Sequence, residues 1–322
     1  MGYLLLAMLM CWPAWLNGQA FFLQDTTAYI KGAASGVALI AHSSTAEAWL
    51  HAAEPIAGEQ ATGQDVEGKH SGRLNEYSSS PDKKGVLAGR SLYYGMYLFL
   101  ITALCSLNLV PFITAILAVI TITSVSLSLG LSHGRTFILL AMLTFVSPLP
   151  FFSSMLMPDI FAGLGILATA AFLFVPPARK FYRYWWALII LSAVLFHTAN
   201  ILIISGILAI ILGMALLLLK TEKSTLARRV ILAFGIVWIG IAGEVFFNAA
   251  VKHFTQHAPI RPPFMSARLV ADGPGTIYAS HFCATASFEI CRYQAALGKG
   301  SSDDFLWSLN PKIGVFTLAS KS

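Results

Sequence analysis

Residues 203–219 read IISGILAIILGMALLLL, a run without a charged side chain. A helix needs about 20 apolar residues to cross a bilayer, with a range of about 17 to 25. Further apolar runs occur at 3–16, 112–129, 136–152, 160–176, 184–201 and 230–249. Since only helices and closed barrels satisfy their backbone groups in lipid, these runs predict an all-α fold, a polytopic transmembrane helix bundle.

The overall composition supports the same class of protein. Hydrophobic residues make up 57% of the 322 residues and charged residues 11%, whereas a soluble domain has roughly 25% charged residues. The net charge of +6 does not point to a nucleic-acid partner, because the basic residues sit mostly in short loops between apolar runs. Membrane lipids are the expected surroundings.

The distribution of basic residues predicts how the chain is oriented. Short loops rich in Lys and Arg stay on the cytoplasmic side. The turns at 153–158 and 198–202 contain none, whereas three other loops carry eight: Arg135, Arg179, Lys180, Arg183, Lys220, Lys223, Arg228 and Arg229. We therefore expect an integral, multi-pass protein of a bacterial inner membrane.

This orientation divides the chain into four parts. Residues 1–16 form the first transmembrane helix, for which a signal peptide is the alternative. Residues 17–111 form an extracytoplasmic loop with juxtamembrane helices, 112–249 the transmembrane bundle, and 250–322 an extracytoplasmic C-terminal segment. The run at 92–110 is also apolar, but its aromatic residues and its end at Pro111 favour a juxtamembrane helix. An ordinary spanning helix is the alternative.

Two acidic residues follow apolar sequence on the predicted outer face. Asp25 lies just after the first apolar run, and Asp159 begins a later one after Pro158. Either can be a helix cap or a compensating charge at a helix N-terminus, with Asp25 or Thr26 as the N-cap of a helix over 24–52. Carboxylates at the edge of a bilayer can also deprotonate a hydroxyl or hold a divalent cation against a phosphate.

Other polar residues are candidates for binding or structure. His197 and Asn200 lie one turn apart near the outer end of their run, where they can bind substrate or hydrogen-bond between helices. Cys283 and Cys291 are close in sequence and lack the spacing of a zinc site, so we expect a disulfide in an oxidising compartment.

These features resemble those of the GT-C superfamily of membrane glycosyltransferases, such as protein mannosyltransferases and aminoarabinose transferases. The shared features are a first span followed at once by an outer loop with an acidic residue, the interfacial segment Arg90-Ser91-Leu92-Tyr93-Tyr94-Gly95, and a second outer acid. The resemblance implies that Asp25 is the catalytic base or a metal contact and that Asp159 supports it. It also implies a donor sugar on a polyprenyl phosphate.

The expected function is therefore transfer of a sugar from a lipid-linked donor to an extracytoplasmic acceptor. Tyr29, Arg90, His197 and Asn200 would hold the donor phosphate or the acceptor. A divalent metal ion is a candidate cofactor, although many relatives carry an adjacent acidic pair where this chain has Gln24-Asp25.

Two alternatives remain open. The first is a transporter or flippase-like carrier whose polar path is lined by His197, Asn200 and Glu244. The second is a non-catalytic membrane protein, a truncated relic, because the chain is shorter than most members of the superfamily.

Overall fold

The structure is a computed structural model that describes residues 2–41, 44–51, 90–218, 223–256, 263–285, 291, 294, 297–298 and 300–307. Every regular element of these residues is helical, in agreement with the predicted all-α class. Much of the predicted outer loop, residues 52–89, lies outside the described part of the chain. Contacts divide the chain into unit 1, Met1–Trp49 with Arg90–Phe254, and unit 2, Leu50–Gly89 with Thr255–Ser322.

The helices follow one another with short connections where the chain is described. The first group is α1 (Gly2–Leu9), α2 (Trp12–Leu16), α3 (Gln24–Ala41), α4 (Ser44–His51), α5 (Leu92–Leu104) and the 3-10 turn η1 (Leu107–Leu109). The second is α6 (Val110–Ser128), α7 (His133–Val146), α8 (Leu149–Ser154), α9 (Asp159–Phe174), α10 (Lys180–Phe196), α11 (Ala199–Leu218) and α12 (Lys223–Thr255). Unit 2 contains α13 (Phe264–Ala271), α14 (Pro274–Phe282) and α15 (Ser302–Trp307).

Prolines divide two of the predicted spans. The run at 3–16 is broken between α1 and α2, with Pro13 in the first turn of α2. The run at 136–152 becomes α7 and α8, with Pro148 and Pro150 at the start of α8. Proline lacks the backbone donor that a continuing helix needs and fits the first turn of a new one, so a single helix over either run was a wrong prediction.

Within the described residues, three helical stretches are long and apolar enough to cross a membrane: Leu107–Ser128, Ala199–Leu217 and Thr225–Phe254. In an apolar window of 18 residues, 61% of the first is buried within the protein, compared with 22% of each of the other two. Large exposed apolar surfaces of this kind are not stable in water. They are the surfaces that a membrane protein presents to lipid.

Helix α5 is short for an apolar helix. Its 13 residues extend about 20 Å at 1.5 Å per residue, less than the ~30 Å hydrocarbon core. A helix of this length does not cross by itself.

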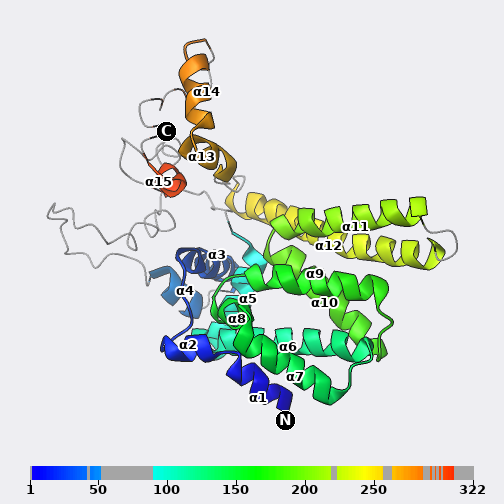
Figure 1. The fold of residues 1–322 in the computed structure, drawn as a ribbon. Coiled ribbons are helices and arrows are strands. Elements are labelled where there is room, and N and C mark those ends of the chain that lie inside the picture. The colour runs from blue at the N-terminus through cyan, green and yellow to red at the C-terminus, as the bar shows by residue number, and fades with distance from the viewer. Residues whose placement is uncertain are drawn as a thin grey trace. The chain divides into compact units, whose positions relative to one another are not determined.

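In unit 1, α6, α7, α9 and α10 lie side by side (Figure 1). Helix α10 is joined to α6 by two hydrogen bonds from indole groups. Trp185 Nε1 donates to Thr121 Oγ1 at 3.0 Å, and Trp186 Nε1 donates to Ser124 Oγ at 2.9 Å. Since Trp186 and Ser124 are buried, these bonds satisfy polar groups that lipid could not.

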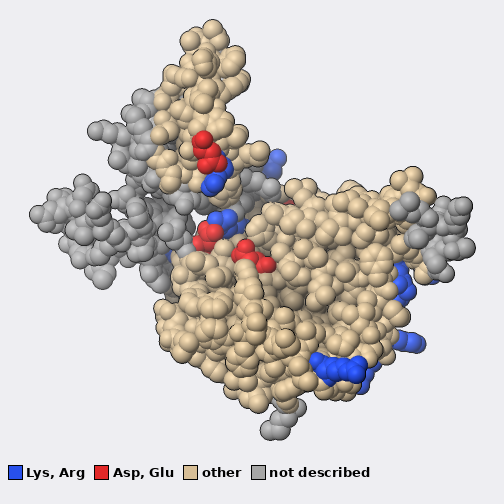
Figure 2. Space-filling view, viewed as in Figure 1, with Lys and Arg blue, Asp and Glu red and all other residues tan. Residues whose placement is uncertain are grey.

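One end of unit 1 gathers basic residues. The backbone N–H of Ala178 donates to Ser128 Oγ at 3.0 Å, so the connection before α10 meets the end of α6. Arg229 of α12 donates to the Leu173 carbonyl of α9 at 2.7 Å. The described basic residues near these connections are Arg135, Arg179, Lys180, Arg183, Arg228 and Arg229, and we call this the basic end. Figure 2 shows basic groups at the lower right edge, separated by a broad uncharged band from acidic groups that have another basic group beside them.

Helix α5 approaches α3 closely at Gly95. A Cβ added to Gly95 would overlap the carbonyl oxygen of Tyr29 and lie 3.3 Å from the Cβ of Ala33. Small residues allow helix backbones to approach in this way. The contact brings the segment after Arg90 against the helix that carries Asp25.

We expect Gly95→Ala to destabilise the protein by about 1–3 kcal/mol, because the added methyl group must displace the backbone of α3. The measurement is thermal unfolding in detergent micelles. The matched control is Gly163→Ala on α9, where an added Cβ meets no atom within 4 Å. That change should stabilise the helix by up to about 1 kcal/mol, and equal effects of the two changes would contradict the close approach.

Candidate functional site

The segment between α2 and α3 is held against the segment between α8 and α9. The Phe21 N–H donates to the Ser154 carbonyl at 2.9 Å, and the Leu156 N–H donates to the Phe21 carbonyl at 3.1 Å. These bonds form an isolated parallel bridge between Phe21 and Met155. We call this pairing of residues 20–26 with residues 154–156 the strap.

Thr26 completes the strap and shapes the start of α3. Its hydroxyl, which is fully buried, donates to the Leu156 carbonyl at 3.2 Å and accepts from the Leu23 N–H at 3.1 Å. Helix α3 begins at Gln24, which places Asp25 second and Thr26 third in the helix. The prediction that either residue is the N-cap was therefore wrong, because Thr26 caps from inside the first turn as in a capping box.

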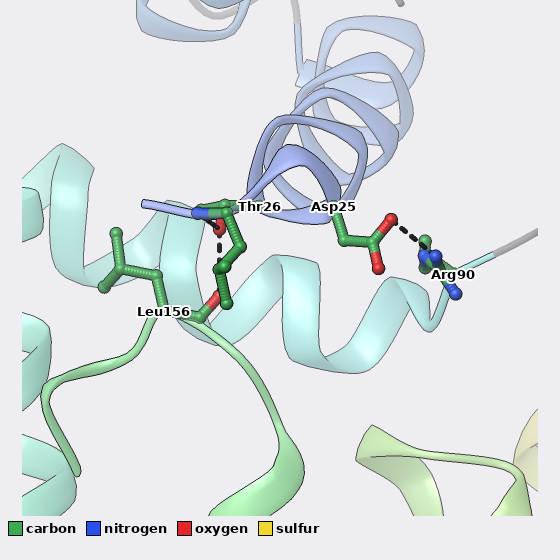
Figure 3. Close-up of polar contacts among 5 residues, drawn as sticks. Asp25, Thr26, Arg90 and Leu156 are labelled. Atoms are coloured by element: carbon green, nitrogen blue, oxygen red, sulfur yellow. Dashed lines mark hydrogen bonds and ion pairs between the residues drawn. The ribbon is translucent and has the colours of Figure 1, made fainter. Parts of the chain in front are cut away.

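Asp25 forms an ion pair with Arg90. One carboxylate oxygen contacts Nη2 of Arg90, and the two side chains are 33% and 27% exposed. Figure 3 shows Asp25 and Thr26 pointing apart, Asp25 toward Arg90 and Thr26 toward the Leu156 carbonyl. Charge-assisted pairs of this kind are strong, and this one lies where water and a charged ligand can still reach it.

Arg90 is positioned by the start of α5. The next residue, Ser91, is the N-cap of α5: its hydroxyl accepts from the Tyr94 N–H at 3.3 Å and donates to the Leu195 carbonyl at 2.6 Å. One hydroxyl therefore satisfies a donor at the start of α5 and an acceptor near the end of α10. Arg90 is held between α3 and α10 as a result.

Tyr29 lies close enough to the ion pair and to Asp159 to be influenced by their charges. It lies one helical turn after Asp25, on the same face of α3, and is only 3% exposed. Burial raises the pKa of its hydroxyl, the nearby Arg90 charge lowers it, and Asp25 and Asp159 raise it. The structure therefore gathers Asp25, Arg90 and Asp159 around one buried tyrosine, and we call this group the acidic end.

Asp159 itself is the first residue of α9 and is exposed. Its charge lies beside the unsatisfied N–H groups of the helix start, where a carboxylate is favoured. Because Thr26 binds Leu156, three residues before Asp159, the strap accounts for its place near Tyr29.

An aromatic cluster underlies the acidic end. Tyr29 meets Tyr94 edge-on with ring centroids 5.0 Å apart, and Tyr94 stacks on Tyr97 at 5.7 Å. Phe161 and Phe196 close the cluster at 4.7 Å from each other. The rings come from α3, α5, α9 and α10, so they form a rigid, packed aromatic surface against which the charged groups lie.

His197 and Asn200 serve the connection between α10 and α11. The Asn200 side chain is buried and its Nδ2 donates to the Ala193 carbonyl at 2.8 Å. His197 Nδ1 accepts from the Ala199 N–H at 3.2 Å. Asn200 thus satisfies a carbonyl at the end of α10, which is the structural role the sequence left open. His197 directly follows Phe196 of the aromatic cluster and is partly exposed.

The acidic end offers at most two carboxylates, those of Asp25 and Asp159, to a divalent ion. Within the described residues, no group of three or more His, Cys, Asp or Glu side chains is placed to hold a metal. Asp25 already contacts a guanidinium, and Asp159 contributes a single carboxylate. Magnesium sites usually use one or two carboxylates together with water and substrate phosphates, so these residues do not form a protein-bound metal site by themselves.

Unit 2 contains the predicted cysteine pair. Cys283 and Cys291 form a disulfide with their Cα atoms 5.3 Å apart. Cys283 packs against a small core of buried residues: Ala267, Val270, Ala279, Leu297, Phe305 and Leu306. The remaining cysteines, Cys11 and Cys105, are free thiols.

Thr26, Ser91 and the aromatic rings other than that of Tyr29 were not recognised as parts of the site from the sequence. The Asp25–Arg90 pair joins residues 65 positions apart, and no local pattern predicts such a contact. The sequence does carry one signal for Thr26. Thr26 is the third residue of a helix that follows the apolar Leu23. At this position a hydroxyl can accept a hydrogen bond from the backbone N–H of the residue before the helix.

We expect Thr26→Val to destabilise the protein by about 1–3 kcal/mol, because it removes a buried donor from Leu156 and an acceptor from Leu23. The matched control is Thr27→Val, one position further on the same helix. It should change the unfolding free energy by less than about 0.5 kcal/mol. Equal losses for the two variants in chemical unfolding would show that the strap does not depend on Thr26.

No protein-family model matches the chain, and no curated protein or solved structure matches it. Its function is therefore inferred from the geometry of the acidic end.

Proposed function

We propose that the chain is a multi-pass protein of a bacterial inner membrane, with its basic end in the cytoplasm and its acidic end outside. Three observations support this. Three helical stretches are long enough to cross, basic residues gather at one end of unit 1, and unit 2 holds a disulfide of the kind that persists in oxidising compartments. Positive residues favour the cytoplasmic side.

We propose further that the acidic end is the site of a GT-C-like glycosyltransferase. It would move a sugar from a polyprenyl-phosphate donor to an extracytoplasmic acceptor. The observation that carries this proposal is the gathering of Asp25, Arg90 and Asp159 around Tyr29, at the end opposite the basic residues. A cation next to a carboxylate suits a reaction in which an anionic phosphate leaves while a hydroxyl loses its proton.

The proposed step is a single inverting displacement. Asp25 takes the proton from the acceptor hydroxyl, and the acceptor oxygen forms a bond to the anomeric carbon of the sugar. The bond from that carbon to the phosphate oxygen breaks, and the polyprenyl phosphate leaves with the electron pair. Arg90 neutralises the departing phosphate, and Asp159 orients the acceptor. His197 follows Phe196 of the aromatic cluster and is partly exposed, and it would contact one of the substrates.

The two alternatives draw less support from the described residues. A carrier needs His197, Asn200 and Glu244 to line a path, but the buried amide of Asn200 already binds a helix-end carbonyl. A scaffold or relic has no need to bury a tyrosine among three charged side chains. Both alternatives predict no transfer activity.

The orientation is testable with single cysteines in a variant without free thiols. Asn17→Cys follows α2, and Leu129→Cys follows α6 at the basic end; both positions are exposed. We expect a membrane-impermeant maleimide to label Asn17→Cys in intact cells and Leu129→Cys only after permeabilisation. The opposite pattern would reverse the proposed orientation, and labelling of both from outside would contradict membrane crossing between them.

The transfer is testable with protein reconstituted in vesicles and a panel of polyprenyl-phosphate sugars, by measuring release of polyprenyl phosphate. We expect Asp25→Asn to lower the rate about 10²- to 10⁴-fold, as loss of a general base does. Arg90→Gln should weaken donor use as well.

The matched control is Asp272→Asn, which removes the carboxylate of another Arg–Asp pair, with Arg268 on the surface of unit 2. It should leave the rate unchanged. Release that does not depend on Asp25, or no release with any sugar from well-folded protein, would overturn the proposed activity.

A further inference from the structure

A cavity of about 320 Å³ lies in unit 1 between α1–α2 and the start of α6. Its volume falls in the range of about 300–1,000 Å³ that is typical of ligand pockets. It is separate from the acidic end, since it shares no residue with that group. The lining residues are Met8, Cys11, Ala14, Trp15, Gly18, Gln19, Ala20, Asn108, Leu109, Pro111 and Phe112.

The break between α1 and α2 builds one wall of this cavity. Met8 lies near the end of α1 and Cys11 in the turn between the two helices. Ala14 and Trp15 lie in α2, and Gly18 lies in the turn after it. Ala14 and Ala20 present only methyl groups, and nothing lies within 4 Å of a Cβ built on Gly18. These three small residues leave space in this wall beside the larger Met8 and Trp15.

The chemistry of the wall changes along its length. None of its described lining residues carries a charged side chain, so no side-chain charge favours a phosphate or an ammonium group inside it. Its polar side chains are the two amides of Gln19 and Asn108, both near the α2–α3 connection. Asn108 Oδ1 accepts from the Ala20 N–H at 3.4 Å. The remainder of the wall is apolar, apart from the thiol of Cys11.

The surface around the cavity is that of a protein facing lipid. Leu4, Leu5 and Leu16 on α1–α2 are 52%, 55% and 81% exposed, and Leu104 near η1 is 81% exposed. Trp15, which lines the cavity, is 55% exposed and belongs to a residue type that concentrates at the headgroup level. A molecule that reaches this cavity from the side must come through the bilayer.

We propose that the cavity binds one hydrocarbon chain of a membrane lipid, with the amides of Gln19 and Asn108 near the uncharged linkage of the lipid. The volume of the cavity, its lack of charged side chains and its lipid-facing rim all fit this occupant. In a bilayer an empty cavity would leave its walls without contacts on one side, and a chain restores those contacts. The inference requires membrane embedding but not sugar transfer.

The test is photocrosslinking of the full chain in nanodiscs. Two probes are used separately, a phosphatidylglycerol with a diazirine on its acyl chain and a farnesyl phosphate with a diazirine on its isoprenoid chain. Crosslinked peptides are then identified by mass spectrometry. We expect crosslinks to the peptides that contain residues 8–20 and 108–112, and the probe that gives them identifies the chain as acyl or isoprenoid.

The discriminating variant is Met8→Trp, which fills the cavity from its half-exposed rim, and its matched control is Met142→Trp at an exposed position of α7. We expect Met8→Trp to lower crosslinking at these peptides about tenfold, as loss of favourable chain contacts would, and Met142→Trp to leave it unchanged. If Met8→Trp does not fold, Ala14→Phe, with exposed Ala170→Phe on α9 as control, gives the same comparison.

Equal crosslinking in the filled and control variants would overturn the proposal, because it would show that the probes report only the lipid-facing surface. Absence of crosslinks from both probes would overturn it as well. Neither result bears on the activity of Asp25, so failure of this inference and failure of the proposed transfer are distinguishable.

Discussion

The strap between residues 20–26 and residues 154–156 is the constraint on which the acidic end depends. Two connections far apart in the sequence satisfy each other's backbone groups there, as irregular backbone away from water requires. The buried hydroxyl of Thr26 adds a hydrogen bond to the Leu156 carbonyl. Asp25 is next to Thr26 in the sequence and Asp159 is three residues after Leu156, so this bond holds the segments that carry the two acids together. The aromatic cluster also links the two helices that carry these acids, α3 and α9, through Tyr94, which contacts both Tyr29 and Phe161.

Helix α5 supplies the second half of the arrangement. It is too short to cross a bilayer alone, yet it contacts four helices through different groups: Ser91 binds α10, Tyr93 donates to the Gly243 carbonyl of α12 at 2.6 Å, Gly95 admits α3, and Tyr97 bonds Thr114 of α6 at 2.9 Å. A helix held at so many points is a rigid support for the residue before it. The backbone of Arg90 is therefore held in a fixed position relative to Asp25, and preorganised charge stabilisation requires such a fixed position.

Much of the fold could be predicted from the sequence because the length of an apolar run can be counted from neighbouring residues alone. The helical class, the apolar runs and the basic loops follow from it, and Asp25 and Asp159 were identified by their place at the ends of those runs. The breaks at Pro13 and Pro148 were missed because run length was counted without regard to proline. The Asp25–Arg90 pair, the strap and the aromatic cluster could not be predicted, since each depends on which helices become neighbours in space.

Asn200 was predicted to bind substrate because it is a polar residue in an apolar run. In the structure its side-chain amide instead donates to a carbonyl at the end of α10, the helix that precedes its own.

The indole bonds between α10 and α6 have a consequence for the distant end of the bundle. Apolar side chains allow two helices to slide, because one leucine contact replaces another at little cost. An indole N–H only donates, and a shift of α10 by one turn, about 5.4 Å, would separate Trp185 and Trp186 from Thr121 and Ser124 together. These two bonds therefore fix the position of α10 along its axis relative to α6. They also fix where α10 ends, and so where Phe196 and His197 lie relative to the charged groups.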